Sequence, residues 1–238
     1  MTLRVAILQC DDVLEKFQPQ FGHYPDMIRQ MFALVDQVDG SFEFKIFDCR
    51  QGHYPDDIDD HDVYVTTGSK ASVYDNERWI QQLIHFVDHL NRHKKKLIGI
   101  CFGHQIIAMA CSGRVEKSTR GWGIGVGVNR IVATPRWMSE ETNELNIIVS
   151  HQDQITTLPD DALVIAESDF CPYFMVQWSD HFLSIQGHPE WNRDYSRTLI
   201  NDRRTIIAPE RIESGLESLS IAPDNRLFVR WILDFLQH

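Results

Sequence analysis

Short strand patterns alternate with helical patterns through residues 3–110, and this alternation restricts the fold more than any other feature of the sequence. Residues 3–8 are mostly apolar, as in a buried strand, whereas residues 79–93 place apolar side chains at helical spacing. In this half we predict strands at residues 3–8, 42–47, 62–66 and 97–100, and helices at residues 27–38 and 79–93. Strands that alternate with helices predict a parallel sheet with helices on both faces.

The strand candidates of the second half follow one another more closely. They lie at residues 123–131, 145–150, 163–166, 174–178 and 182–186. This spacing favours antiparallel strands added at one edge of the parallel sheet, and helical patterns at residues 194–206 and 224–236 follow. Because no Ser/Gly-rich linker interrupts the sequence, we predict a single domain over residues 1–238. Its expected fold class is α/β, a three-layer sandwich with a mostly parallel central sheet and antiparallel strands at one edge.

The charge and the cysteine content limit the partners and the cellular compartment that we expect for this chain. The sequence has 23 Lys and Arg against 34 Asp and Glu, a net charge of −11, which disfavours nucleic acid as a partner. Five scattered cysteines do not form a disulfide framework. No basic leader segment and no apolar run of roughly 18 residues is visible, so we expect no membrane association and a cytoplasmic location.

The strongest chemical signal is Gly99-Ile100-Cys101-Phe102-Gly103, where an apolar strand meets a helical stretch. This is the elbow in which glycines flank a nucleophile, here with cysteine in place of serine. The thiol lies near a helix N-terminus, where the helix dipole favours the thiolate, and the amide of Phe102 points to where an oxyanion develops. The alternative is a buried cysteine at an ordinary strand-to-helix turn.

A second signal, His188-Pro189-Glu190, directly follows the predicted strand at residues 182–186. Pro189 restricts its own backbone and that of the residue before it, which fixes the two flanking side chains relative to each other. Glu190 can then accept a hydrogen bond from one ring nitrogen of His188 while the other nitrogen faces the thiol. Alone the tripeptide is more often a turn, but together with the elbow it predicts a catalytic triad.

With these residues in view, the chain resembles a class I glutamine amidotransferase domain, the glutaminase module of GMP synthetase and its relatives. The motifs that resemble the family are Gly99 to Gln105 at the nucleophile and Gln186 to Glu190 at the base. The resemblance implies a flavodoxin-like glutaminase fold. It also implies that Cys101 is the nucleophile, His188 the general base and then acid, and Glu190 the residue that orients His188.

The same resemblance implies further site residues. Phe102 and either Gly68 or Ser69 would supply the oxyanion amides, the latter two from the turn Thr67-Gly68-Ser69-Lys70. The amino-acid end of the substrate would be held by Gln105, Ser150, His151 and Gln152. His151 could instead be a second base, although its place in the Ser-His motif favours a wall of the substrate site.

Two departures from the family pattern affect this transfer of roles. The family loop often reads Gly-Gly-Pro where this chain has Gly68-Ser69-Lys70. The second oxyanion donor could therefore be either Gly68 or Ser69. An aromatic residue commonly precedes the catalytic His, but here the position is Gly187, which predicts a roomier pocket beside the base. Such a pocket would admit substrates larger than glutamine, as in the related γ-glutamyl peptidases.

No metal or cofactor is expected. The glycines of residues 121–127 lack the spacing of a dinucleotide fingerprint, and no Gly-Lys-Ser/Thr exists for a phosphate loop. His85, His89 and His93 share a helix face opposite its apolar residues, so we place them on the solvent side.

Three functions therefore remain open. The first is a glutaminase that hydrolyses the glutamine side-chain amide through a γ-glutamyl thioester. Because residues 191–238 are too few for a fused acceptor domain, its ammonia would pass to a separate synthase subunit. The second is a γ-glutamyl peptidase acting on glutathione-like compounds, and the third is a non-catalytic module that binds a partner.

Overall fold

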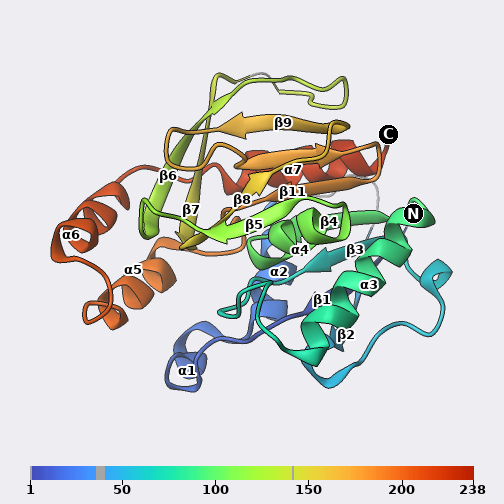
Figure 1. Ribbon diagram of the computed structural model, residues 1–238, viewed down its shortest axis with the longest axis horizontal. Coiled ribbons are helices and arrows are strands. Elements are labelled where there is room, and N and C mark those ends of the chain that lie inside the picture. The colour runs from blue at the N-terminus through green and yellow to red at the C-terminus, as the bar shows by residue number, and fades with distance from the viewer. Residues whose placement is uncertain (1, 36–40, 141) are drawn as a thin grey trace.

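A nine-stranded mixed sheet forms the centre of the computed structural model, which describes residues 2–35, 41–140 and 142–238 (Figure 1). Across the sheet the strands are β2 (Phe42–Asp48), β1 (Leu3–Gln9), β3 (Val63–Thr66), β4 (Lys96–Ile100), β11 (Phe182–Ile185), β10 (Met175–Trp178), β9 (Ala162–Glu167), β6 (Gly123–Ile131) and β7 (Glu144–His151). From β2 to β11 neighbouring strands are parallel, and from β11 to β7 they are antiparallel. The predicted α/β class, with antiparallel strands added at one edge, is confirmed.

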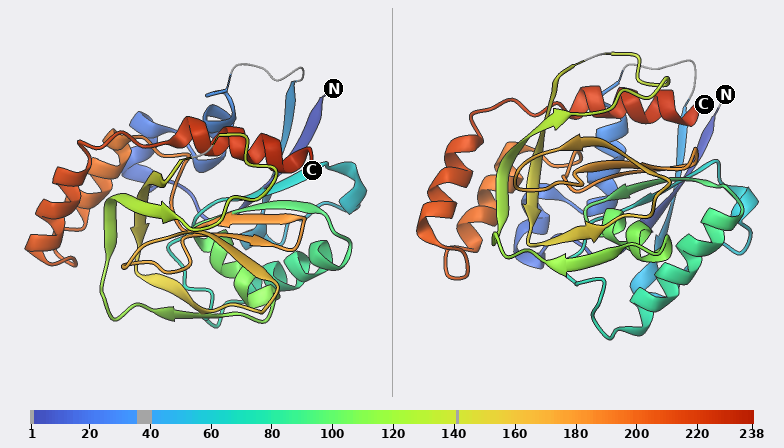
Figure 2. Two further views of the ribbon diagram at one scale, coloured as in Figure 1. Left: turned by 90° about the horizontal axis from the view of Figure 1, so that it is seen from above. Right: turned by 45° about the horizontal axis from the view of Figure 1, so that its top comes forward.

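Helices cover both faces of the parallel part, and Figure 2 shows the sheet between them. The helices α2 (Tyr24–Phe32) and α7 (Asn225–Leu236) pack on one face, while α3 (Arg78–Arg92) and α4 (Phe102–Ala110) pack on the other. Strand β1 illustrates why both faces are apolar. Val5 and Ile7 point to the first pair of helices, whereas Ala6 and Leu8 point to the second pair.

Two further helices, α5 (Arg193–Asp202) and α6 (Pro209–Ser218), pack beside β6 and β7 around a smaller apolar cluster. At Gly125 of β6 the backbone has a φ of +85°, and a Cβ there would lie 2.4 Å from the carbonyl oxygen of Gly215 in α6. Only glycine therefore allows this strand and helix to approach so closely.

Several elements differ from the sequence prediction. Helix α6 and the short strands β5 (Arg114–Lys117) and β8 (Asp153–Thr157), which pair as a second small sheet, were not predicted. The helix predicted at residues 27–38 is α2, which begins at Tyr24, and residues 36–38 lie outside the described residues. In place of the helix predicted at residues 194–206, α5 ends at Asp202 and a turn follows.

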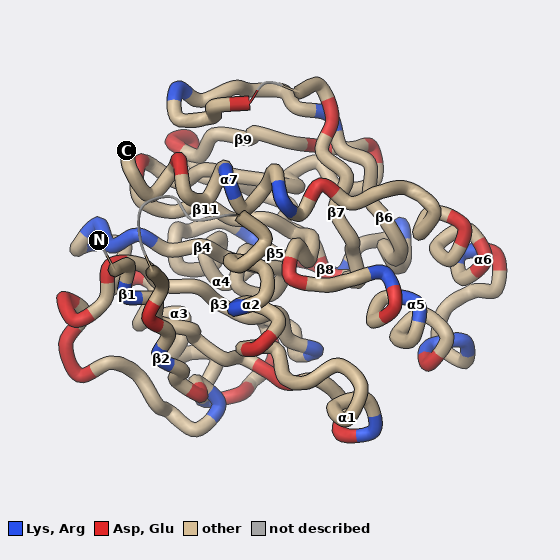
Figure 3. The backbone as a smooth tube through the Cα atoms, turned by 180° about the vertical axis from the view of Figure 1, so that it is seen from behind, with Lys and Arg blue, Asp and Glu red and all other residues tan. Residues whose placement is uncertain are grey.

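Acidic and basic residues are interspersed along the backbone (Figure 3). In the described ranges no helix is both long and apolar enough to cross a membrane. The side chains of His85, His89 and His93 are exposed, as predicted, and the described part of the chain contains no cluster of His, Cys, Asp and Glu suited to a metal ion.

Candidate active site

The carboxyl ends of four adjacent parallel strands bring the predicted residues together. Asp11 follows β1, Gly68 follows β3, Cys101 follows β4 and His188 follows β11. In a parallel sheet these ends meet at one edge, which is where α/β folds commonly place their binding sites. Residues nearly 180 positions apart in sequence therefore belong to one site because the strand order places them there.

Cys101 occupies a strained turn between β4 and α4. Its φ is +50°, an uncommon value for a residue other than glycine, and only 5% of the residue is exposed. The flanking glycines are required by space, since a Cβ at Gly103 would lie 1.6 Å from Thr66 Oγ1 and a Cβ at Gly99 would lie 2.6 Å from Ile107 Cδ1. The predicted elbow is thus present, and it holds the thiol at the N-terminus of α4.

His188 is buried and held from two directions. Its Nδ1 lies 2.7 Å from Oε1 of Glu190, and its ring stacks on Trp191 with centroids 3.6 Å apart and planes 10° apart. Burial lowers the pKa of His188, but the neighbouring Cys101 and Glu190 outweigh it and raise the pKa to about 10. A protonated His188 is therefore the charge state that this environment favours near pH 7.

Gly68 lies against both Cys101 and His188. A Cβ at this position would be 2.7 Å from Cε1 of His188 and 3.7 Å from Cβ of Cys101. The amide of Gln186 also approaches the thiol, with Nε2 3.5 Å from Sγ of Cys101. The three predicted triad residues are therefore neighbours, with the Gly68 backbone at their side.

The backbone amides near the thiol fall into two groups. The amide of Thr67 donates to Leu8 O at 3.1 Å, and that of Lys70 donates to Oδ2 of Asp11, also at 3.1 Å. Among the described residues no acceptor contacts the amides of Gly68 and Ser69. Phe102 is the first residue of α4, where an amide has no partner within the helix. The predicted oxyanion donors are thus amides that remain available.

A pocket of about 200 Å³ opens onto Cys101. Its lining includes six of the predicted site residues, namely Ser69, Cys101, Gln105, Ser150, His151 and Gln152. Of the other lining residues, Lys70 and Asp153 end the two predicted site motifs at residues 67–70 and 150–153. The sequence did not single out the remaining ones, Ala71, Ser72, Trp122 and Arg203. Gln105 helps to build the wall, because its Nε2 donates to Asp153 O at 2.9 Å and to Gln186 Oε1 at 3.1 Å.

The pocket holds charges of both signs. Arg203 donates to Ser150 Oγ and lies over the ring of Trp122, and burial lowers the pKa of its guanidinium. Asp153 accepts hydrogen bonds from Ser72 Oγ at 2.5 Å and from Tyr74 Oη at 2.9 Å. An amino acid presents one carboxylate and one ammonium group, and this pocket offers a cation and an anion.

His151 is a buried wall of this pocket. Its Nδ1 lies 3.2 Å from Asp153 O, and burial, with a smaller effect from His188, lowers its pKa to about 4. The ring is therefore neutral near pH 7. The imidazole also borders a second pocket of about 400 Å³ beside β6 and α6.

The expectation that Gly187 leaves space beside the base is wrong. A Cβ at Gly187 would lie 2.6 Å from Ile147 Cγ2 and 3.0 Å from Phe174 Cζ. These two buried side chains fill the space next to Gly187. Any preference for larger substrates must come from another part of the site.

The aromatic side chains of Phe21 and Tyr24 pack behind His188. Tyr24 stacks on Trp191 and lies 3.1 Å from Tyr195 through the two hydroxyl oxygens, while Phe21, in the short helix α1 (Gln18–Phe21), contacts the ring of Tyr195. Because Trp191 stacks on His188, these rings form a continuous layer behind the imidazole. No sequence motif pointed to Trp191, since its contact with His188 depends on how the turn after residue 188 folds.

The fold and the Cys, His and Glu cluster define a cysteine-centred α/β site, and comparison with known proteins identifies its family. The family described as glutamine amidotransferase class-I matches residues 58–203, so this chain belongs to that family. A glutamine amidotransferase from Thermotoga maritima has a similar fold, with a TM-score of 0.72 over 99% of this chain and 96% of its own, at 16% identity.

Among individual proteins, the chain is similar to γ-glutamyl peptidases of Arabidopsis thaliana. Gamma-glutamyl peptidase 2 is 29% identical over 98% of this chain and 96% of its own length. Gamma-glutamyl peptidase 3 is 34% identical over 82% of this chain and 83% of its own length. A shorter match, 30% identical over 45% of this chain and 22% of the relative, is to the glutamine-hydrolysing GMP synthase of Photorhabdus laumondii.

Proposed function

We propose that this protein hydrolyses γ-glutamyl amide bonds, with Cys101 as nucleophile, His188 as general acid and base, and Glu190 as the residue that orients His188. The observation that carries the proposal is the contact of His188 with Glu190 at 2.7 Å, in a base whose pKa is raised by both Glu190 and Cys101. A base oriented by a carboxylate next to an activated thiol is the arrangement that nucleophilic catalysis requires.

The reaction has two halves. The thiolate of Cys101 attacks the δ-carbonyl carbon, and the amides of Phe102 and of Gly68 or Ser69 bind the resulting oxyanion. Protonated His188 then gives its proton to the leaving nitrogen, the C–N bond breaks and a γ-glutamyl thioester forms. Water attacks the thioester while His188 takes a proton from it, and glutamate leaves as the thiolate is restored.

The pocket at Cys101 supports recognition of the glutamyl end. Its volume of about 200 Å³ is below the range of roughly 300–1,000 Å³ that is typical of sites for drug-sized ligands. We propose that Arg203 binds the α-carboxylate, that Asp153 binds the α-ammonium group, and that Gln105 and the segment 150–152 line the glutamyl chain.

Two substrates share this chemistry. Similarity to the γ-glutamyl peptidases over nearly the whole chain favours γ-glutamyl peptides, including glutathione-like compounds. The shorter similarity to a glutamine-hydrolysing synthase favours glutamine, with ammonia passing to a separate synthase subunit. Of the two we propose γ-glutamyl peptides as the main substrates.

A substrate panel tests this proposal. Glutamine, γ-glutamyl dipeptides, glutathione and a glutathione conjugate are each incubated with the wild-type protein and with Cys101→Ala, and glutamate release is measured. We expect higher kcat/KM for the γ-glutamyl peptides and no turnover by Cys101→Ala. A preference for glutamine would instead support the glutaminase, and turnover by Cys101→Ala would reject the triad. A wild-type protein that hydrolyses none of them and forms no Cys101 adduct with a glutamine diazo-ketone would support a binding module.

A further inference from the structure

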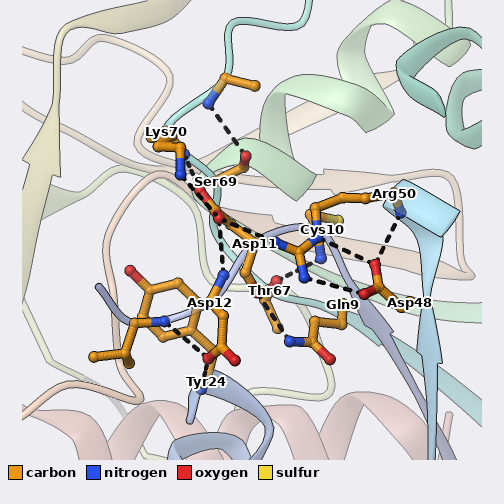
Figure 4. A network of polar contacts seen from close by, with 12 residues as sticks. Gln9, Cys10, Asp11, Asp12, Tyr24, Asp48, Arg50, Thr67, Ser69 and Lys70 are labelled. Carbon is orange, nitrogen blue, oxygen red and sulfur yellow. Dashed lines mark hydrogen bonds and ion pairs between the residues drawn. The ribbon is translucent and has the colours of Figure 1, made fainter. Parts of the chain in front are cut away.

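The loop between Thr67 and Lys70 is attached at both ends to the residues that end and follow β1. The amide of Thr67 donates to Leu8 O at 3.1 Å, and the amide of Cys10 donates to Oγ1 of Thr67 at 2.8 Å. At the other end, the amide of Lys70 donates to Oδ2 of Asp11 at 3.1 Å. Figure 4 shows the contacts of the Lys70 amide with the Asp11 carboxylate and of the Cys10 amide with Thr67.

Between these two attachments lie Gly68 and Ser69, whose amides have no acceptor within the described chain. The hydroxyl of Thr67 donates to Gly68 O at 3.0 Å, so this carbonyl is held on the side of the Thr67 hydroxyl. In a trans peptide the carbonyl and the following N–H point in opposite directions, so the N–H of Ser69 points away from the Thr67 hydroxyl. Ser69 lines the pocket with Cys101. This geometry favours Ser69 over Gly68 as the second oxyanion donor.

Asp11 is suited to hold this loop in one position. Only 6% of the residue is exposed, and a buried carboxylate is costly unless it is paired and hydrogen-bonded. Its Oδ1 accepts the amide of Asp12 at 2.9 Å and lies 3.4 Å from a guanidinium nitrogen of Arg50 and 3.5 Å from Nζ of Lys70. Two amides and two cations thus surround the carboxylate, and its bond to the Lys70 amide is a charge-assisted one.

We propose that Asp11 is a positioning residue for the oxyanion site. By holding the amide of Lys70, it fixes the peptide between Gly68 and Ser69 so that the Ser69 amide faces the oxygen of the tetrahedral intermediate. This inference rests on the proposed hydrolysis at Cys101. It adds a residue outside the triad and outside the pocket lining, which acts on the reaction through the loop from Thr67 to Lys70.

Two substitutions at Asp11 separate the loss of the hydrogen-bond acceptor from a change in side-chain size. Asp11→Ala removes the acceptor of the Lys70 amide, whereas Asp11→Asn keeps one oxygen that can accept it. Misplacing a catalytic group by about 1 Å can cost roughly 100-fold in rate, and we expect Asp11→Ala to lose about that much in kcat. Because the oxyanion forms only after attack, KM should stay near that of the wild type, and kcat of Asp11→Asn should lie between the two.

Asp48→Asn is the matched control. Asp48 belongs to the same network, where it binds Arg50 at 3.0 Å, but it does not contact the loop from Thr67 to Lys70. We expect Asp48→Asn to keep the wild-type kcat. An Asp11→Ala protein that is folded by circular dichroism and has wild-type kcat would overturn the proposal, as would an equal loss of kcat in Asp48→Asn.

Alkylation of Cys101 by iodoacetamide, followed by peptide mass spectrometry, gives a readout that does not use the oxyanion site. We expect Asp11→Ala to alkylate Cys101 at the wild-type rate while its kcat is low. An alkylation rate that falls in parallel with kcat would mean that the thiol itself is disturbed and would overturn the proposal. If Asp11→Ala does not fold, Thr67→Val removes the other attachment at the Cys10 amide and is expected to lower kcat in the same way.

The proposed function and this inference fail differently. A wild-type protein that releases no glutamate from any γ-glutamyl compound contradicts the proposed hydrolysis. Only the role of Asp11 is contradicted if the wild type is active, Cys101→Ala is inactive and Asp11→Ala has wild-type kcat.

Discussion

At the scale of single residues, the imidazole of His188 is confined between two surfaces. Trp191 stacks on one face of the ring, and the backbone of Gly68 lies so close to Cε1 that a Cβ there would be 2.7 Å away. Glu190 fixes the orientation of the ring through its contact with Nδ1. The ring can therefore turn little, which suits a base that must meet one thiol.

Gly68→Ala tests this confinement. The added methyl group must displace either the His188 ring or the loop that contains Ser69, so we expect kcat to fall by about 100-fold with the fold retained. Steady-state kinetics and circular dichroism measure the two effects. Equal activity of Gly68→Ala and the wild type would show that the ring is not confined there.

Glu190→Gln tests how far the charge of Glu190 raises the pKa of His188. Glu190 is one of the groups that raise the pKa of His188, so its neutralisation should lower that pKa from about 10. We expect kcat to fall by roughly 10²–10⁴-fold, as is typical when acid–base catalysis is disturbed, and the alkaline limb of the pH–rate profile to move to lower pH. A histidine NMR titration measures the same shift directly. An alkaline limb that stays in place would contradict the role given to Glu190.

Sequence alone was informative about residues whose roles are set locally. Cys101, His188 and Glu190 sit in short motifs with glycine or proline neighbours, so their chemistry can be predicted from spacing. Asp11, Trp191 and Arg203 stand in no such motif, because each makes its contacts with a partner distant in sequence or through the local fold of a turn. The error at Gly187 has the same origin, since only the fold shows that Ile147 and Phe174 fill the space beside it.

At the scale of elements, the junction of β3, β4 and α4 sets the position of the thiol. Gly103 lies against Thr66 of β3, and the hydroxyl of Thr66 accepts the amide of Ile100 at 3.1 Å. Helix α4 thus contacts the sheet at the point where the chain leaves β4. The sharp turn at Cys101 is a consequence of this close approach.

Gly103→Ala should disrupt this junction. A Cβ at Gly103 would lie 1.6 Å from Thr66 Oγ1, and overpacking of this kind typically costs about 1–3 kcal/mol. We expect a lower free energy of unfolding in urea together with loss of activity, because α4 must move away from β3. An unchanged urea midpoint would show that the helix can shift without cost.

Strand β6 and helix α3 were predicted well, whereas helix α6 and the short polar strands β5 and β8 were not. The predicted strand at residues 123–131 is β6 itself, and the helix predicted at residues 79–93 is α3 within one residue at each end. Strand β5 buries only Val115, so its sequence looks like a loop. It exists because β8 pairs with it, and such pairing cannot be read from either segment alone.

At the scale of the whole molecule, buried histidines make stability depend on pH in both directions. Burial lowers the pKa of His104 to about 3 and that of His151 to about 4, so these rings stabilise the fold above about pH 6.5 and less as the pH falls. Burial lowers the pKa of His188, but Cys101 and Glu190 raise it to about 10. The contribution of His188 to stability is therefore present below about pH 6.5 and is lost as the pH rises toward 10.

Urea unfolding between pH 4 and pH 10 measures both effects. We expect the free energy of unfolding to decline on both sides of neutrality, and the alkaline decline to be smaller in Glu190→Gln because His188 then has a lower pKa. A free energy of unfolding that keeps rising through pH 9 in the wild type would contradict the raised pKa of His188.

The most direct test of the whole account is the identity of the residue that holds the substrate during turnover. Wild-type protein is mixed with a γ-glutamyl dipeptide, quenched in acid within the first turnover, digested and analysed by mass spectrometry. We predict a γ-glutamyl group on the peptide that contains Cys101, and none in Cys101→Ala. Turnover of the dipeptide with the γ-glutamyl group on another residue, or turnover that persists in Cys101→Ala, would contradict catalysis by this site.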